Sequence, residues 1–173
     1  MFFTTTQQEK PTRRYRMYGL VPYNISPIQQ AIQFGHAVVE YANEYFHDHD
    51  YQSWSHDDKT FIILNGGTTN TLIERFGTLN NYKLELEMKS IKTAHFHEPD
   101  LGDQLTAVVF LVDDRVWDRE TYPDYAGSFI SDLNGTRPME NEFNQWKKMF
   151  SDNHEEADRI VWMRDFLRNF RLA

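Results

Sequence analysis

The chain has 173 residues, of which 40% are hydrophobic and 15% aromatic, and its net charge is −8. These values are typical of one folded domain with or without an appendage, and the negative charge argues against broad, non-specific binding to nucleic acid. Cysteine is absent, which excludes disulfides and thiolate chemistry, and no stretch approaches the roughly 20 apolar residues that cross a membrane. The start, MFFTTTQQEK, becomes polar after two aromatic residues and does not resemble a secretory signal. We therefore expect a cytoplasmic protein with no membrane partner.

Basic residues gather near the two ends of this acidic chain. They are Lys10, Arg13, Arg14 and Arg16 near the start, and Arg159, Arg164, Arg168 and Arg171 near the end. If the two ends meet in space, these side chains form a local basic patch; otherwise they are ordinary solvated charges.

The first part of the chain predicts a flexible lead-in, a strand and a long helix. Residues 1–14 are the lead-in, and residues 16–23 predict a short strand that ends at Pro22. Ser26, Pro27 and Gln29 then form a capping-box pattern at the start of a helix. Its expected apolar face consists of Ile28, Ala31, Ile32, Gly35, Val39, Ala42 and Phe46. A polar stripe that includes Gln33 and His36 lies beside this face.

The middle of the chain adds three further strands. We expect a polar loop at 47–59, strands at 60–67, 92–97 and 104–112, and a helix over the ambiguous segment 80–90. A second helix, capped within residues 68–70, is expected to carry Leu72, Ile73, Phe76 and Leu79. The predicted fold is α/β: a small mixed four-stranded sheet with helices packed on it, spanning residues 15–113.

Residues 114–173 predict a C-terminal extension of a loop plus helices. Residues 114–137 are rich in turn signals, and helices are expected near 140–150 and 155–170. The second of these has an apolar stripe of Ile160, Met163, Phe166, Leu167 and Phe170. We expect the stripe to dock on the protein's own core, with a second copy or a partner as the alternatives.

The sequence predicts no metal site and no cofactor. Histidine and aspartate alternate within 47–58, and His95 and His97 alternate on a strand, but neither spacing matches a defined metal site. Phosphate-loop, dinucleotide and serine-hydrolase motifs are absent. His36, Asp100 and Thr106 remain as candidates, because each is expected at the edge of a regular element where a small open sheet forms a crevice.

Two stretches, SPIQQAIQFGHAVVEYA (26–42) and FHEPDLGDQLTAVVFL (96–111), resemble the two signature regions of the type-2 peptidyl-tRNA hydrolases. They are more similar still to a bacterial and phage branch of that family with a Q-x-x-HA helix and an EPDLG-x-x-LTA turn and strand. The resemblance covers roughly residues 15–112. It implies cleavage of the ester that joins a peptide to the 3′ ribose of tRNA, which needs an oriented water, a proton acceptor and donors to the oxyanion.

The resemblance also implies a set of site residues. His36, Asp100 and Thr106 are the implied catalytic residues, and the implied substrate-binding residues are Gln29, Gln33, Gly102 and Gln104. Two positions depart from the family pattern: a family lysine is Gln29 here, and a family threonine is Gln104. A neutral amide cannot engage phosphate as an ammonium does, so the first change weakens the expectation of ordinary peptidyl-tRNA hydrolysis.

Two functions stay open. The first is an ester hydrolase that acts on peptidyl-tRNA or a related acylated nucleotide. The second is a catalytically degenerate binding protein of the same fold, with tRNA, a nucleotide or a protein as its partner; for a phage protein, this includes a host-directed or anti-defence role. In that case residues 114–173 supply an added interface to a partner or to a second copy.

Overall fold

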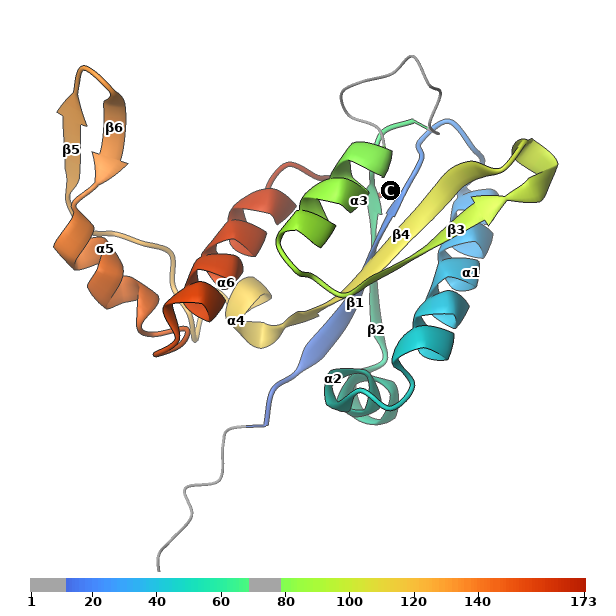
Figure 1. Ribbon diagram of the computed structural model, residues 1–173, viewed down its shortest axis with the longest axis horizontal. Helices are drawn as coiled ribbons and strands as arrows, with labels where there is room; N and C mark the ends of the chain where they lie inside the picture. Colours follow the sequence, from blue (N-terminus) through green and yellow to red (C-terminus); the bar gives the residue numbers. More distant parts are fainter. Residues whose placement is uncertain (1–11, 69–78) are drawn as a thin grey trace, which may run out of the picture.

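The computed structural model describes residues 12–68 and 79–173 (Figure 1). The elements within these ranges are, in chain order, β1 (Tyr15–Val21), α1 (Pro27–Tyr45), α2 (His49–Ser53), the π-helical turn η1 (Trp54–Asp58), β2 (Thr60–Asn65), α3 (Leu79–Met88), β3 (Thr93–Glu98), the 3-10 turn η2 (Pro99–Leu101), β4 (Gln104–Asp113), α4 (Asp114–Trp117), β5 (Phe129–Asp132), β6 (Gly135–Pro138), α5 (Glu140–Lys147) and α6 (His154–Leu167). The helix expected after the cap at 68–70, with Leu72, Ile73, Phe76 and Leu79, falls outside the described residues except for Thr68 and for Leu79, which begins α3.

The main sheet has the strand order β2-β1-β4-β3, so the predicted mixed four-stranded sheet is confirmed. β1 is parallel to β2 and antiparallel to β4, and β3 is antiparallel to β4. β1, β2 and β3 therefore end at the same edge of the sheet, where β4 begins. This edge brings the end of β3, the η2 turn and the start of β4 together.

Helices cover both faces of the sheet (Figure 1). On one face, Phe34, Ala37 and Tyr41 of α1 join a core cluster with Met17 and Val109 of the sheet. On the other face, α3 and α6 supply Leu86, Ile160, Met163 and Phe166 to a second cluster that contains Tyr18, Leu64 and Phe110. Successive residues of β1 thus serve opposite cores, as strand geometry requires.

The start of α1 is confirmed, but its predicted buried face is wrong. Ser26 accepts a hydrogen bond from the Gln29 backbone N–H and Gln29 returns the contact, which completes the capping box. The residues of α1 that lie buried are Gln33, Phe34, Ala37 and Tyr41. Ile28 is 74% exposed and Val39 is 58% exposed. Apolar side chains surround much of this helix, so spacing alone selected the wrong face.

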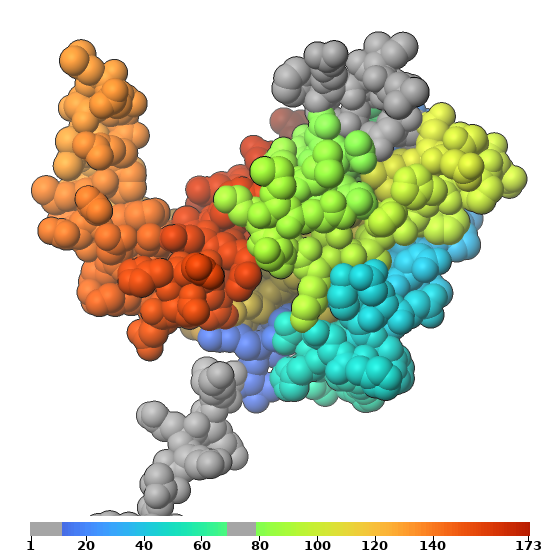
Figure 2. Space-filling view, in the orientation of Figure 1, coloured from blue at the N-terminus to red at the C-terminus, as the bar shows by residue number. Residues whose placement is uncertain are grey.

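Two segments expected to be irregular contain regular structure. The predicted loop at 47–59 forms α2 and η1, since the Asp48 side chain caps α2 and buried Trp54 donates its indole N–H to Thr60 O at 3.2 Å. The turn-rich segment 114–137 contains α4 and most of the β5–β6 hairpin. This hairpin stands clear of the body of the protein (Figure 2).

The C-terminal segment joins the main core, which confirms the predicted docking of its apolar stripe. Ile160, Met163 and Phe166 are buried in the cluster beneath α6, and Leu167 and Phe170 pack against it. Beyond α6 the chain runs along the edge strand β2: the Ala173 N–H donates to Ile63 O at 3.0 Å, and the Asn65 N–H donates to Arg171 O at 2.9 Å.

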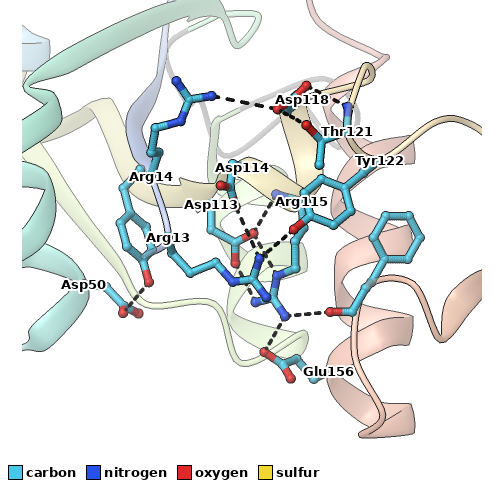
Figure 3. A network of polar contacts seen from close by, with 12 residues as sticks. Arg13, Arg14, Asp50, Asp113, Asp114, Arg115, Asp118, Thr121, Tyr122 and Glu156 are labelled. Carbon is cyan, nitrogen blue, oxygen red and sulfur yellow. Dashed lines mark hydrogen bonds and ion pairs between the residues drawn. The ribbon is translucent and has the colours of Figure 1, made fainter. Parts of the chain in front are cut away.

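A buried arginine links β4 to the C-terminal segment (Figure 3). Arg115 pairs with Asp113 at 2.6 Å and with Glu156 at 2.9 Å, and it donates to Phe150 O at 3.0 Å. Burial disfavours its charge, but the hydrogen bonds and attraction of Asp113 and Glu156 outweigh burial and raise the pKa of Arg115. The Arg115 guanidinium therefore stays charged. Its replacement by a neutral side chain would leave the Asp113 and Glu156 carboxylates unpaired inside the protein.

Among the described residues, no helix combines the length and apolar character that crossing a membrane requires. No group of three or more histidine, aspartate and glutamate side chains in residues 12–68 and 79–173 is arranged to hold a metal ion.

Candidate functional site

A chain of hydrogen bonds joins the two motif regions at the edge where β3 ends and β4 begins. The Thr106 hydroxyl of β4 donates to Gln33 Oε1 of α1 at 2.6 Å. The Gln33 amide in turn donates from Nε2 to Glu98 Oε2 at 2.6 Å. Gln33 is 6% exposed, so both ends of its side chain are satisfied within the protein, as burial of an amide requires. Helix, strand and turn are thus held in one arrangement.

Glu98 also connects this hydrogen-bond chain to the η2 turn, which contains Pro99 and Asp100. Its carboxylate caps η2 by accepting the Asp100 backbone N–H at 3.4 Å. Gly102 follows with φ +70°, a conformation that favours glycine, and its N–H donates to Pro99 O at 3.1 Å. The turn is therefore shaped by backbone hydrogen bonds, and the Asp100 side chain lies exposed at the protein surface.

His36 lies one helical turn after Gln33 and stacks on a strand residue. Its imidazole ring packs on Phe96 of β3, with 4.5 Å between ring centroids and 21° between ring planes. His36 itself is exposed. The aromatic contact fixes the position of the ring over β3 while leaving the residue accessible to a ligand.

Helix α1 and strand β3 run past each other in opposite directions. From the C-terminal end of α1, Tyr45 donates to Thr93 O at 3.3 Å, His36 stacks on Phe96, and Gln33 reaches Glu98. The N-terminal half of α1 is consequently the part beside the η2 turn (Figure 1). His36 on α1 and Asp100 in the η2 turn, two of the candidates from the sequence, are both exposed.

Thr106 occupies a different place from the one that its expected catalytic role requires. The residue is fully buried, and its hydroxyl is engaged with Gln33 and lies 3.3 Å from Phe96 O. It cannot contact a ligand at the surface. Its hydroxyl holds the side chain of Gln33 instead.

Of the predicted substrate-binding residues, Gln33 is engaged in the buried network and Gln29 is engaged in the cap of α1. Gln29 Oε1 accepts from both the backbone N–H and the hydroxyl of Ser26 at 3.0 Å. Gln104 is half-buried and opens β4 opposite Glu98 in the strand pairing. Gly102 shapes the turn through its backbone.

Sequence reasoning missed Glu98 and Phe96 as parts of the site. Glu98 directly precedes Pro99, and a proline at the first position of a helical turn marks the residue before it as the cap. Phe96 alternates with His95 and His97 along β3, which predicts that it faces the side opposite to those histidines. Both signals were present in the sequence, but neither reveals the partner residue on α1.

His95 and His97 lie together on β3, as their alternation predicts, with 5.1 Å between ring centroids. Burial lowers the pKa of His95 from its ordinary value, and the nearby Lys83 and His97 add to this effect. Phe96, on which the His36 ring stacks, lies between them in the sequence. The two histidines are residues of β3, and the hydrogen bonds of the Gln33 side chain go instead to Thr106 and Glu98.

The exposed edge offers two groups that can accept a proton, the His36 imidazole and the Asp100 carboxylate. Ester hydrolysis by water needs such an acceptor within reach of the attacking water. Gln33, Glu98 and Thr106 supply the rigid support that holds helix and turn in register.

The chain matched none of the protein-family models compared with it, and no curated protein matched its sequence.

Proposed function

We propose that the edge formed by α1 and the η2 turn hydrolyses the ester of peptidyl-tRNA or of a related acylated nucleotide. The observation that carries the proposal is the bridge made by Gln33, which hydrogen-bonds Thr106 on one side and Glu98 on the other. It unites in space the two stretches whose sequences resemble the peptidyl-tRNA hydrolase motifs. The first stretch supplies His36, and the second supplies Phe96, Asp100 and the η2 turn.

Under this proposal Asp100 orients the attacking water and accepts its proton, and His36 holds the water or the acylated ribose. Both side chains are exposed, as contact with a macromolecular substrate requires. Thr106 and Glu98 position Gln33, which keeps the helix at a fixed distance from the turn. Their effect on the rate is indirect, through the geometry of the acceptor.

A second candidate function is a binding protein that has lost catalysis, and two observations favour it. Gln29, at the position of the family's lysine, has its side-chain oxygen engaged in the helix cap and carries no charge for a phosphate. In addition, Phe129 and Leu133 of the β5–β6 hairpin are 58% and 106% exposed, which gives the C-terminal segment apolar surface for a protein partner or a second copy.

The test is hydrolysis of an N-acetylated aminoacyl-tRNA by the purified chain. Wild type is compared with Asp100→Asn, with His36→Ala and with Asp103→Asn as the matched control. Asp103 lies in the same turn at φ +57°, where asparagine is well tolerated. We expect Asp100→Asn to lower kcat/KM by about a hundredfold or more, because it removes the proton acceptor. Asp103→Asn is expected to leave the rate within about twofold, a difference worth less than 0.5 kcal/mol.

Absence of turnover by the wild type overturns the hydrolase. In that case retention of tRNA on the immobilised wild type, with loss of retention in His36→Ala, supports the binding protein. Equal losses of rate in Asp100→Asn and Asp103→Asn would show that the turn is needed only for folding.

A further inference from the structure

A hollow of about 410 Å³ lies between β1, β2, α4, α6 and the C-terminal tail. Four arginine side chains line it: Arg16 near the start of the chain, Arg119, and Arg164 and Arg168 near the end, with Trp117 beside them. The rest of its wall is largely apolar and includes Ile62, Leu64 and Leu167. Three of the basic residues near the two ends of the sequence, Arg16, Arg164 and Arg168, thus line one hollow, on a protein whose net charge is −8.

The arginines are held in place before any ligand arrives. The Arg16 guanidinium packs over the Trp117 ring, 3.6 Å from its centroid. Arg164 is 1% exposed and donates to Arg115 O at 2.7 Å and to Tyr122 O at 2.8 Å. Because these side chains are already ordered, binding an anion costs less conformational entropy than it would at flexible surface lysines.

One carboxylate oxygen already occupies the point where three of the guanidinium groups converge. Asp124 Oδ1 lies 2.6 Å from Arg119, 2.8 Å from Arg164 and 2.9 Å from Arg168. Such clustering of planar donors around one anionic oxygen is the arrangement by which arginines bind phosphate. Asp124 is half exposed and Arg168 is 54% exposed, so the cluster opens to solvent on one side.

Positive charge in the cluster exceeds what its carboxylates neutralise. Of the four arginines that line the hollow, Arg119, Arg164 and Arg168 contact Asp124, and Arg168 also contacts Asp165. Arg16 packs on Trp117 instead. Burial lowers the pKa of Arg119, and the neighbouring Arg164 and Arg168 contribute further. An added anion would relieve this mutual repulsion, which gives the site a preference for negative charge.

We propose that this hollow binds a nucleotide unit, with the phosphate on the arginines and the base or sugar against the apolar wall. A volume of about 410 Å³ suits a small molecule of that size, and arginines next to apolar surface match its two halves. The nucleotide is either free or the end of an RNA strand. Because the protein is acidic elsewhere, the hollow selects a phosphate by local geometry and not by overall charge.

The nucleotide site is separate from the edge beside α1. Tyr18 and Leu64 belong to the core cluster beneath α6, whereas Met17 and Phe34 belong to the cluster beneath α1. The hollow and helix α1 are therefore on opposite faces of the sheet. The two proposals can fail independently.

The test is calorimetric titration of the full chain with AMP, adenosine, inorganic phosphate, and a short oligoribonucleotide with or without a 5′-phosphate. The double variant Arg119→Gln/Arg168→Gln removes two solvent-accessible guanidinium groups without touching buried Arg164. Arg137→Gln/Lys148→Gln is the charge-matched control, since both of its residues are exposed and away from the hollow. We expect AMP to bind the wild type, the double variant to bind it about tenfold or more weakly, and the control to be unchanged.

The choice of ligands distinguishes a free nucleotide from the end of an RNA strand, and it also tests whether a nucleotide binds at all. Preference for the 5′-phosphorylated strand over AMP assigns a strand end, and the reverse preference assigns a free nucleotide. Adenosine binding as tightly as AMP, phosphate binding as tightly as AMP, or an equal loss in the control variant overturns the proposal. If the double variant does not fold, titration of wild type labelled at the arginine Nε–H groups replaces it: unchanged NMR signals of Arg16, Arg119 and Arg168 with AMP would overturn the assignment.

Discussion

The Thr106 hydroxyl donates a hydrogen bond of 2.6 Å to Gln33 Oε1, although the two residues are 73 positions apart in the sequence. Thr106 is fully buried and Gln33 is 6% exposed, so water does not compete for this contact. The bond fixes α1 against β4, and through Glu98 it also fixes α1 against the η2 turn. The geometry of the candidate site depends on this pair.

Thr106→Val is therefore expected to destabilise the protein. Valine has a similar shape, but it leaves Gln33 Oε1 without its buried donor, which costs about 1–3 kcal/mol in the free energy of unfolding. Urea denaturation followed by circular dichroism measures the change. The control is Thr136→Val on the exposed strand β6, which is expected to stay within about 0.5 kcal/mol. Equal effects of the two substitutions would argue against a structural role for the Thr106 hydroxyl.

The buried face of α1 can be tested by paired substitutions on its two sides. Phe34→Ala removes a side chain that is 4% exposed, and a loss of about 3–5 kcal/mol in the free energy of unfolding is expected. Ile28→Ser changes a side chain that is 74% exposed and is expected to cost less than about 1 kcal/mol. A larger cost for Ile28→Ser than for Phe34→Ala would restore the face that apolar spacing predicts.

Stability is expected to depend on pH through His95. Its folded-state pKa lies below the ordinary value of 6.5, chiefly because burial disfavours the charged ring. As the pH falls below 6.5, the unfolded chain binds the proton first, so stability present above that pH is lost as the pH falls through the folded pKa. NMR titration of the ring protons is expected to give a midpoint below 6.5 in wild type.

Lys83→Gln supplies the control for this titration. The Lys83 ammonium is among the causes that lower the pKa of His95, so its removal is expected to raise the midpoint. A midpoint at or above 6.5 in wild type, or a downward shift in Lys83→Gln, would contradict the environment described for His95.

Gln29→Lys is expected to increase the affinity for tRNA severalfold at low salt, because it adds an ammonium at the exposed start of α1. The same change removes the capping-box contact of Gln29 with Ser26 and lowers stability slightly. Filter binding at two salt concentrations measures the affinity, with Gln145→Lys on α5 as the control for added charge. Equal gains in the two variants would contradict the proposed contact of residue 29 with tRNA.

Local signals in the sequence predicted the start of α1, the strands of the main sheet and the docking of α6. Ser26, Pro27 and Gln29 act within one turn, and the apolar strands and the stripe of α6 each bury against the same core. The helix predicted over 80–90 is confirmed as α3, Leu79–Met88, despite the strand-like alternation in LELEM, since good helix formers dominate the segment.

The remaining features depend on contacts between distant residues. The choice between the two apolar sides of α1 is decided by Phe34 filling the space above Gly19, where an added Cβ would lie 2.2 Å from the Phe34 ring. Burial of the polar Gln33 is possible only because Thr106 and Glu98 satisfy it. No local sequence pattern predicts that Thr106 or Glu98 is a partner of Gln33.

The candidate site was predicted in part. The sequence indicated His36, Gln33, Asp100 and Thr106 as candidate site residues. It predicted a catalytic contact for Thr106, whose side chain is buried. It also left Glu98 out, although Glu98 is the residue that joins the turn to the helix.

The most direct test of the central claim is an NMR titration of the wild type with a 3′-(N-acetylaminoacyl)adenosine that carries no phosphate. If α1 and the η2 turn form the acyl-ester site, the His36 ring, the Gln33 side-chain amide and the Gly102 backbone amide will shift together with one dissociation constant, while the arginines of the hollow will not. Saturation of the protein with these three signals unmoved would contradict the account.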